Sequence, residues 1–276
     1  MRAAARAGTA GLPALATAAA VVLMSGPGVS LAQSADELAQ QLANPVADLI
    51  SVPLQFNFEQ NIGPQDSGER FTLNAQPVVP IPLNDNWNLI SRTIVPLIRQ
   101  TDVAPGSGSQ TGLGDTVQSL FFSPRAPTAS GWTWGIGPAL LAPTATDNLL
   151  GSGQWAAGPT AVALRQQGPW TYGLLTNHLK AFAGSDNRPD INATFFQPFL
   201  VYNTPTAWTY SLNAESTYDW ETRGWSAPVQ LGAGKVTRIG KQTVQFLGAV
   251  RYYADSLPNG PEGLALRFSV VLLYPR

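Results

Sequence analysis

The sequence has 276 residues, no cysteine and a single histidine, His178. The missing thiols exclude disulfides, thiolate metal sites and cysteine nucleophiles. Any catalytic imidazole would have to be that of His178. Charged residues make up 12% of the chain, about half of the usual share. The net charge of −1 gives no reason to expect nucleic acid or a polybasic membrane contact.

Beyond its first residues the chain also lacks any apolar run long enough for a membrane-spanning helix. Aromatic residues, glycine and proline are plentiful instead, with 8 Trp, 7 Tyr, 11 Phe, 26 Gly and 23 Pro. Few charges combined with many aromatic residues are typical of an outer-membrane β-barrel. The strands of such a barrel alternate, so that their hydropathy averages away along the sequence.

Residues 1–32 are predicted to be a secretory signal that is cleaved before Gln33. Arg2 and Arg6 give it a positive start, an apolar stretch follows, and the small residues around Ala32 suit a signal peptidase. An N-terminal anchor helix is the alternative. The signal predicts export, and with the barrel strands below it predicts location in the cell outer membrane.

Residues 33–50 are predicted to be a periplasmic lead-in with a short helix. Ser34 and Glu37 have the spacing of a capping box, and Pro45 discourages continuation of the helix. The segment is expected to pack at or inside the mouth of the barrel. A disordered mature N-terminus is the alternative.

The last stretch, Leu264 to Tyr274, shows the alternation that organises the remaining chain, residues 51–276. Leu264, Leu266 and Phe268 share one face of a predicted strand, whereas Arg267 and its small neighbours share the other. An apolar outside with a polar inside suits a strand whose apolar face meets lipid. The last strand of a soluble β-sandwich is the alternative for this segment alone.

Similar period-two segments recur from Val52 onward and add up to about twelve strands. Counted from the first, the odd connections tend to be long and polar, whereas the even ones tend to be short. Outer-membrane barrels have long extracellular loops, short periplasmic turns and an even strand number. The sequence therefore predicts an all-β, antiparallel, up-and-down transmembrane barrel. In this reading residues 218–225 are a loop.

Aromatic residues gather at the predicted strand ends, where the headgroups of a bilayer favour amphipathic rings. The predicted membrane-interface aromatics are Trp87, Trp132, Trp155, Trp170, Trp208, Trp225, Tyr252 and Tyr274. Ordinary core or turn aromatics are the alternative. Prolines within the strands oppose the assignment locally, since each removes a donor from the ladder. They are expected near rims or at bulges, and they are Pro77, Pro96, Pro138, Pro159, Pro198 and Pro228.

Several short motifs resemble the MetA-pathway phenol-degradation family of outer-membrane barrels, whose members are often labelled transporters. They include residues 49–53, 76–80, 88–93, 112–115, 143–147, 150–153 and 197–199. The resemblance covers nearly the whole mature chain. It implies an outer-membrane β-barrel and implies little about the solute. Many outer-membrane strands finish on an aromatic residue, whereas this chain continues with Pro275 and Arg276 after Tyr274.

Charged side chains within membrane strands must face water or partners, since lipid exposure costs about 2–4 kcal/mol for Arg or Lys at the midplane. The face parity predicts that the lumen is lined by Glu59, Arg92, Asp115, Gln197, Glu215, Arg251 and Arg267. One interpretation is a constriction that selects solutes. The alternative is a set of mutually paired residues that fill and rigidify a narrow barrel.

The predicted function is passive uptake of small solutes, including aromatic or otherwise apolar ones given the family's setting. A structural or adhesive barrel is the alternative, and a lipid hydrolase based on His178 is a remoter one, because no nucleophile motif accompanies this residue. The chain is predicted not to be an enzyme, with no metal site and no cofactor, since its loop carboxylates and glycines lack the required spacing. The predicted partners are outer-membrane lipid, small solutes and the barrel-insertion machinery.

Overall fold

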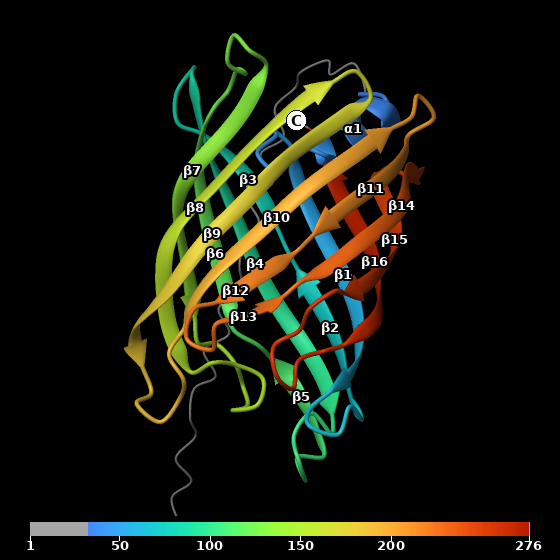
Figure 1. The fold of residues 1–276 in the computed structure, drawn as a ribbon. Coiled ribbons are helices and arrows are strands. Elements are labelled where there is room, and N and C mark those ends of the chain that lie inside the picture. Colours follow the sequence, from blue (N-terminus) through green and yellow to red (C-terminus); the bar gives the residue numbers. More distant parts are fainter. Residues whose placement is uncertain (1–32, 276) are drawn as a thin grey trace, which may run out of the picture. The chain divides into compact units, whose positions relative to one another are not determined.

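The computed structural model describes residues 33–275, so that the predicted signal peptide, residues 1–32, lies outside the described residues. The described chain begins with one short helix and continues as antiparallel strands of a single sheet. The first strand pairs with the last, and the sheet closes on itself into a barrel (Figure 1). No helix within residues 33–275 is long and apolar enough to cross a membrane.

The helix α1 spans Ala35–Leu42. The strands are β1 (Ile50–Ile62), β2 (Gly68–Ala75), β3 (Val78–Pro82), β4 (Trp87–Thr101), β5 (Ser109–Leu113), β6 (Thr116–Pro124), β7 (Trp132–Ala142), β8 (Gln154–Gln167), β9 (Trp170–Gly184), β10 (Asn192–Asn203), β11 (Trp208–Ala214), β12 (Ser216–Asp219), β13 (Gly224–Ser226), β14 (Pro228–Ile239), β15 (Gln242–Tyr253) and β16 (Gly263–Tyr274).

These sixteen segments form twelve barrel strands. β2 and β3 lie end to end between β1 and β4, and β5 and β6 follow one another along β4. β11 and β12 follow one another along β10. On their other side, β14 pairs with β11 and β13 pairs with β12, so that these two also lie end to end. The predicted fold, a closed antiparallel barrel of twelve strands, is confirmed.

The prolines explain where the barrel strands are interrupted. Pro77 lies between β2 and β3, and Pro228 opens β14 just after β13 ends. Pro138 and Pro159 face each other across β7 and β8, and the ladders on their other sides skip both residues. Because proline has no N–H to donate, each can sit in the wall only where a ladder is already open. The interruptions thus lie within the wall as well as at its rims.

The two faces of the sheet differ as the alternation predicts. In β16 the side chains of Leu264 and Leu266 are 56% and 55% exposed on the outer face, whereas Ala265 and Arg267 are 2% and 7% exposed. A strand with this pattern has its apolar side outward and its polar side enclosed. The alternative of a soluble sandwich would bury the outer row, and it is excluded by this exposure.

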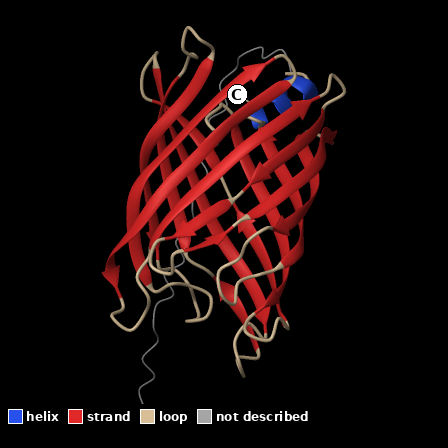
Figure 2. Ribbon diagram, viewed as in Figure 1, coloured by secondary structure: helices blue, strands red, loops and turns tan. Residues whose placement is uncertain are grey.

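The connections fall into two groups at opposite ends of the barrel (Figure 2). At the end near α1 and the C-terminus the turns are short, as in residues 168–169 and 240–241. The other end carries longer loops, such as residues 143–153 and 254–262. We refer to these as the turn end and the loop end.

The prediction of a loop over residues 218–225 is wrong. Tyr218 pairs with Trp225 and Asp219 with Gly224, so β12 and β13 form a hairpin that extends the wall. The Oδ1 atom of Asp219 accepts hydrogen bonds from the backbone N–H groups of Glu221 and Thr222. This local capping makes a tight turn and replaces the expected loop.

The segment before β1 folds back into the turn end of the barrel. Ser34 caps α1 in a capping box with Glu37, because each side chain accepts a hydrogen bond from the other residue's backbone N–H. Leu38 and Ala39 of α1 are buried in one cluster with inward-facing residues of several strands. That cluster consists of Leu38, Ala39, Leu49, Ala207, Val236, Val271 and Leu273.

The stretch between α1 and β1 reaches a second cluster on the other side of the lumen. Val46 is buried together with Ile90 of β4, Phe121 of β6 and Leu175 of β9. Two hydrogen bonds also hold α1 to the wall, since Gln40 donates to the carbonyl of Gly168 and accepts from the side chain of Gln166. We call residues 33–49 the plug segment, because their apolar side chains occupy lumen space at the turn end.

Candidate functional site: a charged layer inside the barrel

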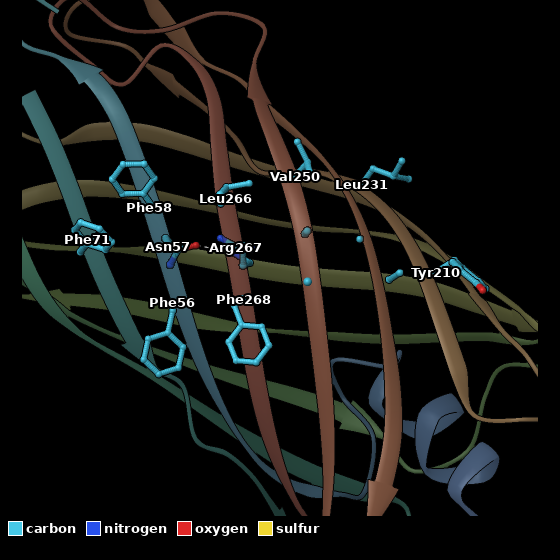
Figure 3. A pocket seen from close by; sticks show the side chains of 14 residues that line it. Phe56, Asn57, Phe58, Phe71, Tyr210, Leu231, Val250, Leu266, Arg267 and Phe268 are labelled. Carbon is cyan, nitrogen blue, oxygen red and sulfur yellow. Dashed lines mark hydrogen bonds between the residues drawn. The ribbon is translucent and has the colours of Figure 1, made fainter. Parts of the chain in front are cut away.

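The inner wall carries a layer of paired charges built around Arg267 of β16. Its Nη1 and Nη2 atoms donate to the two carboxylate oxygens of Glu215 at 2.5 and 2.8 Å. Its Nε atom donates to Oδ1 of Asn57 in β1 at 2.7 Å (Figure 3). A two-pronged guanidinium–carboxylate pair of this kind is both strong and directional. Arg267 is thereby fixed both to its neighbour β1 and to Glu215, which lies beyond β15 and β14 in the sheet.

Arg251 of β15 joins the same layer. Its Nη2 atom donates to Glu215 at 3.2 Å, and its Nη1 atom lies 3.3 Å from Oδ1 of Asn57 and 3.5 Å from Oε1 of Glu59. The hydroxyl of Tyr253 donates to the same Glu59 oxygen at 2.6 Å. The layer therefore runs without a gap across one sector of the barrel.

Local backbone chemistry explains why Glu215 can reach the arginines. Glu215 falls in the break between β11 and β12, where Pro198 in the neighbouring β10 cannot donate to it. On its other side, the N–H of Glu215 donates to the carbonyl of Pro228. An interruption of this kind lets a strand re-aim a side chain. The two prolines thus position the carboxylate.

A second polar group lies at another strand break. Gln76 follows β2, and its N–H donates to the carbonyl of Pro53. Its side chain accepts from Nη2 of Arg92 in β4 at 2.8 Å and donates to Oε1 of Gln55 at 2.6 Å. Among the described residues Arg92 forms no ion pair within 4 Å.

The layer is positively charged overall. Arg92, Arg251 and Arg267 carry three positive charges, against the two negative charges of Glu59 and Glu215. Arg251 and Arg267 are 5% and 7% exposed, so their charges are held by partners and not by bulk water. Such a layer can select solutes by charge and hydrogen bonding.

A cavity lies between this layer and the plug segment. It has a volume of about 220 Å³ and is bounded by the plug segment on one side and by Arg92 and Gln76 on the other. Gln197 of β10, a predicted lumen residue, also lines it. The cavity shows that side chains do not fill the lumen throughout.

Asp115, another predicted lumen residue, lies apart from the charged layer. It lies in the break between β5 and β6 and accepts hydrogen bonds from the backbone N–H groups of Ala145 and Ser152 and from the Ser152 hydroxyl. Its carboxylate therefore anchors the 143–153 loop at the loop end. The alternation along the strand did not predict this role, because Asp115 falls in the break between two strands.

Replacing Asp115 by Asn should loosen the 143–153 loop while the wall stays intact. The amide removes the charge that strengthens three accepted hydrogen bonds, a loss of roughly 1.5–3 kcal/mol for hydrogen bonds to a charged group. Limited proteolysis should then cut this loop faster than in the parent chain. Asp186→Asn, in the neighbouring loop, is the control. Equal cleavage rates in both variants would contradict the anchoring role.

Two further inward-facing residues near the layer were not predicted. Arg70 pairs in register with Glu59 across β1 and β2, and its Nε atom donates to Gln100. Tyr253 follows the predicted interface residue Tyr252 and occupies the opposite face. Both share the parity of the predicted inner residues, so the alternation contained the signal for them. The plug segment was expected at or inside the mouth of the barrel, but the alternation held no signal for which wall residues it contacts.

The predicted interface aromatics divide between the two ends. Trp87, Trp132, Trp170 and Trp208 open strands that follow turn-end connections, and Tyr274 closes β16 there. Trp155, Trp225 and Tyr252 belong to strand ends at the loop end. Most of these rings are exposed, as a ring at the headgroup level would be. Their membrane role stays a prediction.

His178 lies on the outer face, in register with Thr194 of β10. Its Nδ1 atom is 2.9 Å from the hydroxyl of Thr194, which also accepts from Nε1 of Trp220. Among residues 33–275 no group of three or more His, Cys, Asp or Glu side chains could hold a metal ion. The surroundings of His178 are thus a polar patch near the loop end.

The outer wall behind the charged layer is apolar. Figure 3 shows Leu231, Val250, Leu266 and Phe268 standing on strands β14 to β16 around a shallow groove. Gly248 and Ala233 face each other at its floor. The same strands therefore present apolar side chains to one side and the arginine layer to the other.

Comparison of the sequence with family models gives no match, and comparison with curated proteins gives none either. The structure is similar to an outer membrane channel from Pseudomonas putida F1, with a TM-score of 0.65 at 14% identity over 82% of this chain and 96% of that one. An active-site mutant of outer membrane phospholipase A from Escherichia coli gives a TM-score of 0.51 at 14% identity, over 88% and 99% of the two chains. The calcium-bound phospholipase dimer from Salmonella typhi gives 0.50 at 12% identity, over 88% and 99%.

These neighbours include a channel and phospholipases, so proteins of this fold differ in function. The similarity therefore concerns the architecture, and the function depends on the residues of this chain. The resemblance to the phenol-degradation family stays a prediction, since no family model matches. What the comparisons establish is the fold, the twelve-stranded antiparallel barrel of outer-membrane proteins.

Proposed function

We propose that this protein is a channel through which small solutes cross the outer membrane passively. The observation that carries the proposal is the charged layer of Arg251, Arg267 and Glu215 inside a wall whose outer face is apolar. Burying arginines is costly unless partners hold them. A barrel needed only as an anchor could fill its lumen with apolar side chains instead.

The proposed route runs from the loop end past the charged layer and into the cavity beside Arg92. It then has to pass the plug segment at the turn end. Both narrow places are built from side chains, so solutes would be sorted by size and charge and not sieved by a wide aqueous pore. Aromatic or otherwise apolar solutes, which the family resemblance implies, would have to be small.

The expected result in planar bilayers is a low single-channel conductance with a preference for anions, since the charged layer has one more positive than negative charge. Reversal potentials in a salt gradient measure that preference, and liposome swelling with a panel of solutes measures passage. Boiled, unfolded protein is the control. A folded chain that never conducts and admits no solute would leave a sealed structural barrel as the better account.

A further inference from the structure

The cavity between the plug segment and the charged layer has two unlike walls. Its apolar wall comes from the plug segment and from inward-facing residues of β9 and β10, among them Leu42, Leu49, Leu175 and Phe199. Its polar wall holds Arg92, Asn213 and three of the four lining glutamines, Gln55, Gln76 and Gln197, while the plug segment adds the side chains of Gln41 and Asn44. Of the described residues that line the cavity, Arg92 is the one that carries a charge. We propose that this cavity binds a small organic monoanion, a carboxylate attached to an apolar body.

The charge of Arg92 is not neutralised by any ion pair in the described chain. Arg251 and Arg267 share the carboxylate of Glu215, whereas within residues 33–275 Arg92 has no carboxylate within 4 Å. Its one side-chain hydrogen bond in the described chain, from Nη2 to Gln76, leaves other guanidinium donors free for a ligand. A guanidinium matches a carboxylate in a planar, two-pronged pair. An anion bound in the cavity would therefore give Arg92 the carboxylate partner that the charged layer does not supply.

Two amides add unused hydrogen-bonding groups. Oδ1 of Asn213 is buried and accepts no hydrogen bond from the described residues. The side chain of Gln197 likewise makes none with residues 33–275, although it lines the cavity. An amide can turn either its N–H₂ or its oxygen toward a ligand. A buried polar group without a partner, such as Oδ1 of Asn213, is uncommon in native proteins, and a bound polar solute would satisfy it.

The apolar wall sets the other half of the preference. Contact with Leu42, Leu49 and Phe199 stabilises a ligand that buries apolar surface against them. A second carboxylate would meet this wall without a partner, and desolvating it would be costly. A cation would meet Arg92 and no acidic residue of the lining. The two walls together favour one negative charge at one end of a small apolar molecule.

This inference rests on the proposed function, and it is tested by binding, which needs no conduction. The probe is benzoate near neutral pH, titrated into the full chain in detergent by calorimetry. Benzamide has nearly the same shape without the charge, and phthalate carries a second carboxylate. Saturable benzoate binding at one site per chain is expected, and both other probes should bind about tenfold more weakly or worse, by the strength of a charged hydrogen-bonded pair.

Variants of Arg92 locate the site. Arg92→Gln should weaken benzoate binding about tenfold or more while benzamide binding stays unchanged. Arg92→Lys keeps the charge but loses the planar guanidinium, so its affinity for benzoate should lie between those of the parent chain and Arg92→Gln. Arg165→Gln, which lies in register with Trp132 and Tyr172 on the outer wall, is the matched control. Heat-modified mobility on gels checks that each variant is folded.

Equal affinity for benzoate and benzamide, or full affinity in folded Arg92→Gln, would overturn the site. Absence of benzoate binding by the folded parent chain would overturn it as well. Conduction is measured separately on the same preparations. A chain that conducts without binding benzoate would refute the anion site alone, whereas a chain that binds benzoate but never conducts would refute the channel and leave a binding barrel.

Discussion

Deleting residues 33–46 should raise the single-channel conductance several-fold and reduce the fluctuations of the open-channel current. The deleted residues place Leu38 and Ala39 in one inner cluster and Val46 in another on the far wall. Side chains that occupy the lumen exclude ions and water from it, so their removal widens the route at its turn end. The barrel strands begin at Ile50 and keep their pairing with β16.

A single substitution separates plugging from folding. Leu38→Ala removes buried methyl groups from α1, and the contact of a fully buried leucine is worth about 2–5 kcal/mol. The plug segment should then leave its seat more often, so that brief high-conductance openings appear. Leu231→Ala, at a residue of the outer wall that is 66% exposed, should change neither current nor openings. Unchanged conductance in a folded deletion chain would contradict the plugging role.

Protease digestion in vesicles offers an independent measurement of the same displacement. The parent chain buries Leu38, Ala39 and Val46, so cleavage within residues 33–46 should be slow. In Leu38→Ala cleavage should accelerate while the strands remain protected. The two readouts report on the same equilibrium between a seated and a released segment, and they should therefore change together.

The sequence was sufficient for the architecture because a barrel strand has only two faces. In β16 each second residue is apolar, and this fixes both the outward row and the inward position of Arg267. The count of twelve followed from the turns between such segments. The helix start at Ser34 was equally readable, since a capping box is a local pattern.

The alternation along a strand does not reveal how deep in the barrel a side chain lies, which residue it contacts or where the strand is interrupted. Glu215 meets Arg267 only because the sheet closes and because a break between β11 and β12 re-aims its side chain. Asp115 has the same acidic character, yet it lies in the break between β5 and β6, where it holds the loop at the loop end. The position of Val46 inside the lumen depends on tertiary packing. A short apolar stretch in the sequence does not indicate which part of the wall it will contact.

Replacing Glu215 by Gln should destabilise the barrel and strengthen its anion preference. Glu215 accepts three hydrogen bonds from Arg251 and Arg267, whose side chains are 6% exposed. Removing one member of a buried ion pair leaves a charge without compensation, which typically costs about 3–5 kcal/mol. The midpoint of urea unfolding in vesicles should fall, and the reversal potential should shift further toward that of the anion.

Glu221→Gln is the matched control for this change. Glu221 lies in the turn between β12 and β13 and accepts one hydrogen bond, from Asn192, at an exposed site. Exposed interactions contribute little to stability, so this variant should unfold at the parent's urea concentration with the parent's selectivity. Similar behaviour of the two variants would mean that the charged layer does not contribute to the stability of the wall.

The double variant Glu215→Gln with Arg267→Gln decides whether the loss comes from the unpaired charge. Removing Arg267 as well leaves Arg251 with Asn57 and Glu59 as partners, so part of the stability should return. Residues in one network are coupled, and the coupling appears as non-additivity of the two changes. Additive losses would instead mean that each side chain acts through its own packing, and the ion pair would then contribute to selectivity without holding the barrel together.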